Sequence, residues 1–326
     1  MPGSRTIDGR GKSVSRPVLF VDSLPELRAG SSYLRTTQLC ELSKAAFEDA
    51  GIRSQVTSSL AHRDSILILN KNSLLATKPW RLRRLKRRNN VVVADPLDGK
   101  VDAERLGCCD LLLAASLTQF DALSTEFPDK KVAYVGHHVD LRLPPVNPPT
   151  ERFRLGYFGE IGNAAFSETP NLPVEFVAIE TMRADITGWM EKLALFNAHY
   201  ALRKTQSFDG FKPFTKGFVA AHCGSPILVG SDDVEARRHL PADYPFVADA
   251  SSVETVIAAI GRMREAFVGP EWQIALDAMA GIRRQTTPDA IADQLVRAIA
   301  PHALAGQAKH RGGNPGWIAR LFRRPG

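Results

Sequence analysis

The sequence predicts an α/β protein of two domains, each built on a parallel β-sheet with helices on both faces. Short runs rich in Val, Ile and Leu alternate with longer helical patterns, which is typical of strands buried in a parallel sheet. The proline-rich stretch 143–153 interrupts this alternation, because proline fits neither a central strand nor a helix interior. The alternation then resumes. The length of 326 residues also favours two domains.

The first half begins with a strand over 17–24 (PVLFVDSL), which ends in polar turn residues. A helix is expected over about 33–50, with Leu39, Leu42 and Ala46 on one face and Gly51 just past its end as a C-cap. The remaining elements of this half are strands at 52–58, 64–70, 90–96, 110–116 and 131–136, and helices near 76–88, 101–107 and 117–126.

The second half begins with strand 154–160 (RLGYFGE), which leads into a glycine-containing turn. Further strands are expected at 174–179, 225–230 and 244–249, a helix followed by a short strand within 185–203, and helices at 216–223, 252–267, 270–284 and 287–300. Two such halves imply two Rossmann-like domains facing a central cleft, over 17–145 and 146–303. Ligands should bind in this cleft, where strand C-termini meet helix N-termini.

Composition excludes several classes of protein. A hydrophobic content of 44% argues against a disordered chain, and no apolar run is long enough to span a bilayer. The N-terminus lacks the apolar region of a signal peptide. Four scattered cysteines, without CxxC spacing, suit neither a disulfide scaffold nor a zinc site. We therefore expect a cytoplasmic protein with reduced thiols.

The net charge of +7 lies at the ends of the chain. Residues 1–16, expected to be a disordered basic N-terminus, carry +3, and the basic tail 304–326 carries +5, which leaves 17–303 at −1. Nucleic-acid binding is not expected, since no recognised module or aromatic platform accompanies the charge. Two stretches mix basic and large apolar residues, 78–88 and 317–324. Both suit a peripheral contact with an anionic membrane at its inner face, and a solvated helix face plus a tail is the alternative.

The segment 207–229 is the most informative about chemistry. Lys212, Thr215 and Lys216 stand where a helix is expected to begin, and this helix ends near Gly224 and leads into a strand. A helix N-terminus has free N–H groups and a partial positive charge, so it attracts phosphate. Two lysines and a hydroxyl there would add contacts to a diphosphate. An ordinary solvated basic turn is the alternative.

This segment (KPFTKGFVAAHCGSPILVG) resembles the C-terminal half of GT-B-fold glycosyltransferases, especially the family-four-like group 1 type. The order of elements agrees over roughly 17–300. Further similar segments are the first glycine-containing loop at 28–35 (RAGSSYLR), the end of the N-terminal domain at 134–140 (YVGHHVD), the first strand and loop of the nucleotide domain at 155–160 (LGYFGE), and the helix before the donor site at 189–203.

The resemblance implies a glycosyltransferase that moves a sugar from a nucleotide-diphosphate donor to a glycan or lipid-linked acceptor. It implies no bound metal and no cofactor other than the nucleotide sugar as co-substrate. The sequence departs from the family in its donor loop, where Phe211 and Val219 stand in place of two glutamates that are often separated by seven residues. No basic residue follows the first strand of the second domain, over 160–165. We expect the diphosphate to be held instead by Lys212, Thr215 and Lys216, with Gly159, Glu160 and Arg203 nearby.

Three residues are candidates for catalysis. His137 and His138 follow the last strand of the first domain, where one could contact a substrate or act as a base near neutral pH, or both could bond backbone carbonyls at a hinge. Asp95, with Asp98 nearby, lies at a strand C-terminus, where it could accept a proton from the acceptor or cap a helix. The candidate acceptor or cleft loop, which could equally be a simple turn, is Gly30, Ser31 and Ser32.

Two other functions remain open at this stage. A non-catalytic nucleotide-sugar-binding partner protein would explain the missing donor-loop glutamates. A nucleotide-sugar epimerase on the same scaffold would need a set of cleft carboxylates that the sequence lacks.

Overall fold

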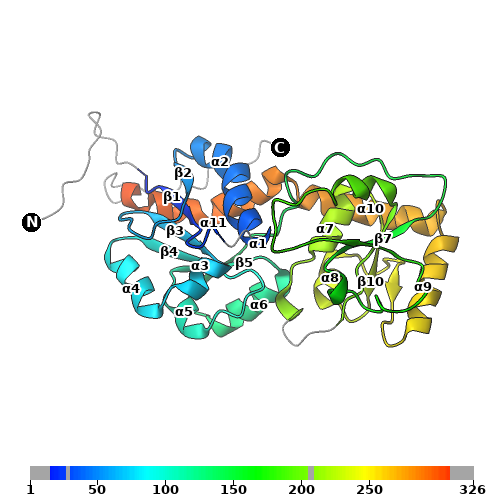
Figure 1. The fold of residues 1–326 in the computed structure, drawn as a ribbon. Coiled ribbons are helices and arrows are strands. Elements are labelled where there is room, and N and C mark those ends of the chain that lie inside the picture. Colours follow the sequence, from blue (N-terminus) through cyan, green and yellow to red (C-terminus); the bar gives the residue numbers. More distant parts are fainter. Residues whose placement is uncertain (1–14, 27–29, 205–208, 309–326) are drawn as a thin grey trace, which may run out of the picture.

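The computed structural model describes residues 15–26, 30–204 and 209–308 of the chain (Figure 1). These residues form two α/β domains that lie side by side, each with a parallel sheet and helices on both faces. Most of the predicted basic N-terminus (1–16) and of the predicted basic tail (304–326), including 317–324, lies outside the described residues.

The sheet of the N-terminal domain has six parallel strands in the order β2-β1-β3-β4-β5-β6. Strands β1, β3 and β5 are buried along their whole length, as their unbroken apolar sequences predict. The strand order reverses between β1 and β3, which is the point where α/β folds of this kind bind ligands. The bounds are β1 (Val18–Val21), β2 (Ser54–Thr57), β3 (Ile66–Asn70), β4 (Val91–Asp95), β5 (Leu111–Ala114) and β6 (Lys131–Tyr134).

The helices of this domain follow the predicted positions, with two differences. The helix expected over 33–50 begins earlier and contains a π-helical turn, Tyr33–Gln38. The helix expected near 76–88 begins at Pro79, and an unpredicted helix over 71–76 precedes it, because Thr77 and Lys78 are extended before Pro79, which takes the first helical position. The bounds are α1 (Gly30–Ser32), α2 (Leu39–Asp49), α3 (Lys71–Ala76), α4 (Pro79–Arg87), α5 (Ala103–Gly107) and α6 (Leu117–Glu126).

The C-terminal domain has a five-stranded parallel sheet in the order β11-β10-β9-β7-β8, which reverses between β7 and β9. Its strands are β7 (Leu155–Gly159), β8 (Glu175–Ala178), β9 (Ala198–Tyr200), β10 (Ile227–Gly230) and β11 (Val247–Ala248). Its helices are α7 (Thr215–His222), α8 (Val234–His239), α9 (Val253–Glu265) and α10 (Pro270–Gln285), with short 3₁₀ turns at Ile161–Asn163, Glu191–Leu195 and Asp209–Phe211.

The last helix, expected at 287–300 within the second domain (146–303), packs on the first domain instead. Helix α11 (Pro288–Ala308) returns to the N-terminal domain, where Figure 1 shows it in orange among the blue elements. Ile291, Leu295 and Ile299 are fully buried and share a core cluster with Leu39 and Phe47 of α2. Their spacing of four residues revealed an apolar helix face but not which sheet it covers.

The helix expected within 185–203 is also largely absent. Residues before β9 form only turns and the 3₁₀ segment Glu191–Leu195. Asp185, Thr187 and Gly188 have low helix propensity, and the segment is anchored by the buried side chains of Met190 and Leu193 instead.

All four cysteines lie in the described part of the chain, and each is a buried free thiol. Of the helices described, none has the length and apolar character needed to cross a membrane.

Candidate active site

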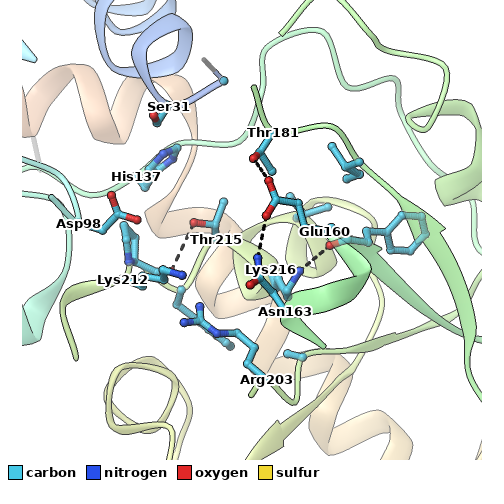
Figure 2. A pocket seen from close by; sticks show the side chains of 18 of the residues that line it. Ser31, Asp98, His137, Glu160, Asn163, Thr181, Arg203, Lys212, Thr215 and Lys216 are labelled. Atoms are coloured by element: carbon cyan, nitrogen blue, oxygen red, sulfur yellow. Dashed lines mark hydrogen bonds between the residues drawn. The ribbon is translucent and has the colours of Figure 1, made fainter. Parts of the chain in front are cut away.

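A cavity of about 580 Å³ lies between the two domains, at the strand C-termini of both sheets. The residues around it come from the loops that follow β4, β6, β7 and β9, and from the start of α7. Most of the site residues predicted from the sequence line this cavity: Gly30, Ser31, His137, His138, Gly159, Glu160, Arg203, Lys212, Thr215 and Lys216. In Figure 2, Ser31, His137 and Asp98 are drawn in the upper left of the view, and Lys212, Lys216 and Arg203 are drawn below them.

The loop before α7 is shaped by one aromatic contact. Phe214, the residue before the helix, packs its ring on Gly217, where a Cβ atom would lie 2.0 Å from the ring carbon Cε1. Only glycine leaves room for this packing. Phe214 gives the helix no side-chain cap, so the positive end of α7 faces the cavity without a capping hydroxyl or carboxylate from that residue.

Lys216 lies in the first turn of α7, and its ammonium group points at the end of β7. Its Nζ donates a hydrogen bond of 2.5 Å to the carbonyl oxygen of Phe158 and lies 4.1 Å from the ring centroid of Tyr157. Burial, together with the positive charges of Arg203 and Lys212, lowers the pKa of Lys216 to about 7. An anion entering the cavity would therefore stabilise its protonated form.

Glu160 is an acidic residue that lines the cavity, and its charge acts on Lys216. Its carboxylate accepts hydrogen bonds from the hydroxyl of Thr181 and, at 3.0 Å, from Nδ2 of Asn163 (Figure 2). Thr181 also accepts a 2.8 Å hydrogen bond at its carbonyl from the backbone N–H of Gly30 in the other domain. Sequence reasoning missed Thr181 and Asn163, since both stand in irregular segments without a recognisable pattern.

The imidazole of His137 is neutral, and its Nε2 atom can accept a hydrogen bond. Its Nδ1 lies 2.7 Å from the carbonyl oxygen of His138, and a carbonyl only accepts, so Nδ1 carries the proton. Burial and the charge of Arg35 lower the pKa of His137 to about 4, so the ring is neutral at pH 7 and Nε2 is unprotonated. His138 is packed more deeply: its Nε2 lies 3.3 Å from Oε1 of Gln38, and burial lowers its pKa well below the ordinary value.

Asp95, expected as a catalytic base or a helix cap, lies outside the residues that line the cavity. It is fully buried and accepts hydrogen bonds of 2.8 and 3.2 Å from the guanidinium of Arg35. Arg35 also donates to the carbonyls of Val135 and Gly136, so the pair holds the end of β6 at the hinge. The cavity is instead lined by Asp98, which forms a 2.8 Å ion pair with Lys71.

Ser32 of the expected cleft loop also falls outside the cavity. It is buried, and its hydroxyl accepts a 2.8 Å hydrogen bond from Asn72. Asp233, another residue that lines the cavity, caps the N-terminus of α8 by accepting a 2.9 Å hydrogen bond from the N–H of Ala236. Over the described residues, no group of three or more His, Cys, Asp or Glu side chains is arranged to hold a metal ion.

Comparison with known proteins gives no match by sequence, either to a family model or to a curated protein. Solved structures do match. Sucrose-phosphate synthase from Thermosynechococcus elongatus superposes with a TM-score of 0.57 at 13% identity, covering 90% of this chain and 99% of the other. HepE of Anabaena in complex with UDP gives 0.53 at 12% identity, covering 87% and 99%. A UDP-forming trehalose-phosphate synthase from Burkholderia vietnamiensis gives 0.53 at 11%, covering 83% and 77%.

These structures have the GT-B fold, and the chain has it too. The two-domain α/β architecture and the structural resemblance to GT-B glycosyltransferases, both predicted from the sequence, are confirmed. The assignment of the donor loop to a lysine-containing variant stays a prediction.

Proposed function

We propose that the protein transfers a sugar from a nucleoside-diphosphate donor to a glycan or lipid-linked acceptor. The observation that carries the proposal is the convergence of Arg203, Lys212 and Lys216 with the N-terminus of α7 on one cavity between the domains. The similar structure of HepE has been solved with UDP and with UDP and glucose, which supports a nucleotide sugar as the ligand.

The positively charged side chains of Arg203, Lys212 and Lys216 would act on the leaving group. When the bond to the sugar breaks, the nucleoside diphosphate gains negative charge, and groups that bind it more tightly at that stage lower the barrier. Arg203 offers a planar set of donors, whereas Lys216 is half-buried near Tyr157 and would gain the negative charge of the diphosphate as a partner. We propose that these side chains suffice without a divalent metal, which activity in the presence of EDTA would test.

The first domain would supply the polar contacts to the reacting sugars. The unprotonated Nε2 of His137 is suited to accept a hydrogen bond from a sugar hydroxyl, because a neutral imidazole has one acceptor nitrogen. Ser31 and Asp98 line the same side of the cavity. Asp98 therefore replaces Asp95 as the carboxylate proposed to act on the acceptor.

The decisive experiment combines binding with transfer. Thermal-shift measurements with UDP, GDP, ADP, TDP, CMP and their sugars should identify one nucleotide that stabilises the protein. Lys216→Ala should weaken its binding about 10- to 100-fold, the range expected when hydrogen bonds to a charged group are lost. Lys192→Ala, an exposed lysine on the 3₁₀ turn Glu191–Leu195, is the matched control and should bind normally. Full binding by Lys216→Ala would contradict the assignment of this lysine.

One observation favours a second candidate, a nucleotide-sugar-binding protein without transferase activity. Val219, at a place where related sequences often have glutamate, lines the cavity. An apolar side chain there cannot accept a hydrogen bond from a ligand hydroxyl. Nucleotide-sugar binding with neither transfer nor donor hydrolysis, over a panel of donors and acceptors, would select this candidate.

We also propose that helix α4 touches an anionic membrane surface. Leu82 and Leu85 are buried in the core, but Trp80 is 56% exposed beside the exposed Arg81, Arg84 and Arg87. Exposed aromatic and basic groups together suit the lipid headgroup region. Sedimentation with phosphatidylglycerol vesicles, but not with phosphatidylcholine vesicles, is the expected result. The triple change Arg81→Glu, Arg84→Glu and Arg87→Glu should abolish it.

A further inference from the structure

The two domains also meet at the edge of the cavity, where a carboxylate of one caps a helix of the other. The first amide groups of α6, at Leu117 and Thr118, donate hydrogen bonds of 2.8 and 2.9 Å to the carboxylate of Glu235 in α8. The hydroxyl of Thr118 donates to it as well, at 2.8 Å. Glu235 is only 5% exposed. Nearby, Arg238 of α8 forms an ion pair with Asp121 of α6.

This contact joins an anion to the positive end of a helix. The first N–H groups of a helix have no partner within it, and they favour a negative charge. Burial alone would raise the pKa of Glu235, but the hydrogen bonds from His239, Thr118 and Leu117 outweigh it and lower the pKa. Separating the domains would expose the carboxylate and both amides at once.

The same helix end also holds the loop before α7. Ser116, the N-cap of α6, accepts a 3.2 Å hydrogen bond from the N–H of Gln119 and donates one of 2.8 Å to the carbonyl oxygen of Phe211. Phe211 directly precedes Lys212. The cap of a first-domain helix thereby fixes the backbone beside a cationic residue of the second domain.

A second connection runs through an aromatic stack. Oε1 of Glu235 lies 3.0 Å from Nε2 of His239, and the His239 ring stacks on Phe214 with centroids 5.8 Å apart and planes 16° apart. Phe214 is the residue that packs on Gly217 and sets the start of α7. Glu235 is therefore linked to both ends of the short segment 211–214.

We propose that Glu235 is a positioning residue that couples closure of the two domains to the placement of Lys212, Thr215 and Lys216. The inference rests on the proposed function, in which Lys212, Thr215 and Lys216 bind the diphosphate of the donor. With the domains closed, the α6 clasp (Ser116, Leu117, Thr118, Phe211 and Glu235) holds the loop in its binding arrangement. Coupling is reciprocal, so a diphosphate on the loop favours closure in turn.

The test compares Glu235→Gln with the milder Thr118→Val, which removes the hydroxyl contacts to Glu235 and Ser116 but keeps the backbone N–H. Glu254→Gln is the matched control, because Glu254 is an exposed acid in the first turn of α9. Two measurements need no ligand: hydrogen exchange of peptides covering 115–121 and 211–217, and the radius of gyration in solution. The third is the Kd of UDP, or of whichever nucleotide the wild type binds, by calorimetry.

For Glu235→Gln we expect exchange about tenfold faster in both peptides, a larger radius of gyration that returns to the wild-type value with saturating nucleotide, and a Kd about tenfold weaker. Thr118→Val should shift each quantity in the same direction by less, and Glu254→Gln should shift none. Unchanged exchange in 115–121 would overturn the clasp. Faster exchange there with no change in 211–217 would overturn its coupling to the loop. A wild type that binds no nucleotide would instead refute the proposed function, while both exchange results would still decide on the clasp and its coupling.

Discussion

Gly159 and Lys216 fit together so closely that a Cβ atom on the glycine would lie 2.7 Å from Nζ of the lysine. Gly159 also has a φ of +153°, a conformation that side chains disfavour. The glycine at the end of β7 therefore makes room for the ammonium group that the Phe158 carbonyl holds.

Gly159→Ala should displace Lys216 and weaken nucleotide binding by about tenfold, with an added stability cost of about 1–3 kcal/mol from backbone strain. Calorimetry and denaturant unfolding measure the two effects. Gly162→Ala is the control, since a Cβ at Gly162 meets nothing within 4 Å. Equal nucleotide affinity in Gly159→Ala and wild type would show that the position of Lys216 does not matter for binding.

Nucleotide-sugar affinity should fall as the pH rises above about 7. The pKa of Lys216 is about 7 in the free protein and should be higher in the complex, because the bound diphosphate favours the ammonium form. Below the free pKa the lysine is charged in both states and affinity is constant. Between the free and bound pKa values, binding takes up a proton, and affinity falls up to about tenfold per pH unit.

The charged or titratable neighbours that face Lys216 are Arg203, Lys212, Glu160, His199 and Tyr157. Burial holds the pKa of His199 at about 3 and raises that of Tyr157 to about 12, so neither titrates between pH 6 and 8.5. A UDP-sugar is the suitable probe, because its diphosphate has no free terminal phosphate to titrate. Lys216→Arg should bind with little pH dependence over this range, and the same slope in that variant would contradict the assignment.

Asp95→Asn should destabilise the protein without removing a catalytic group. Breaking a buried ion pair on one side leaves an uncompensated charge on Arg35, which costs about 3–5 kcal/mol. The double variant Arg35→Met, Asp95→Leu should recover much of the loss, since a buried pair can be replaced by apolar side chains. Urea unfolding and activity per folded molecule distinguish the roles. A stable Asp95→Asn protein without activity would restore Asp95 as a catalytic candidate.

The sequence predicted the strands well because each is a short apolar run bounded by turn residues, as in 66–70 and 91–95. It predicted the cationic site for a similar reason, since Lys212, Thr215 and Lys216 are close together in the chain. What it missed depends on partners distant in sequence. Asp95 is paired with Arg35 and Glu235 with the start of α6, and no local pattern gives either contact. The apolar face of α11 was visible, but its partner α2 lies far away in the chain.

The folded state should lose stability as the pH falls below about 6.5, because several histidines are buried in neutral form. Burial lowers the pKa of His137 to about 4 and of His199 to about 3, from an ordinary value of 6.5. The unfolded chain then binds protons that the folded chain does not, so the free energy of unfolding is fully present above pH 6.5 and decreases below it. Below pH 6.5, each histidine contributes about 1.4 kcal/mol per pH unit to the slope of the unfolding free energy against pH.

Urea unfolding of wild type and His199→Leu at pH 7 and pH 5 measures the contribution of His199. The variant should lose about 2 kcal/mol less unfolding free energy than wild type between these pH values. Equal losses in the two proteins would show that His199 is protonated in the folded state at pH 5.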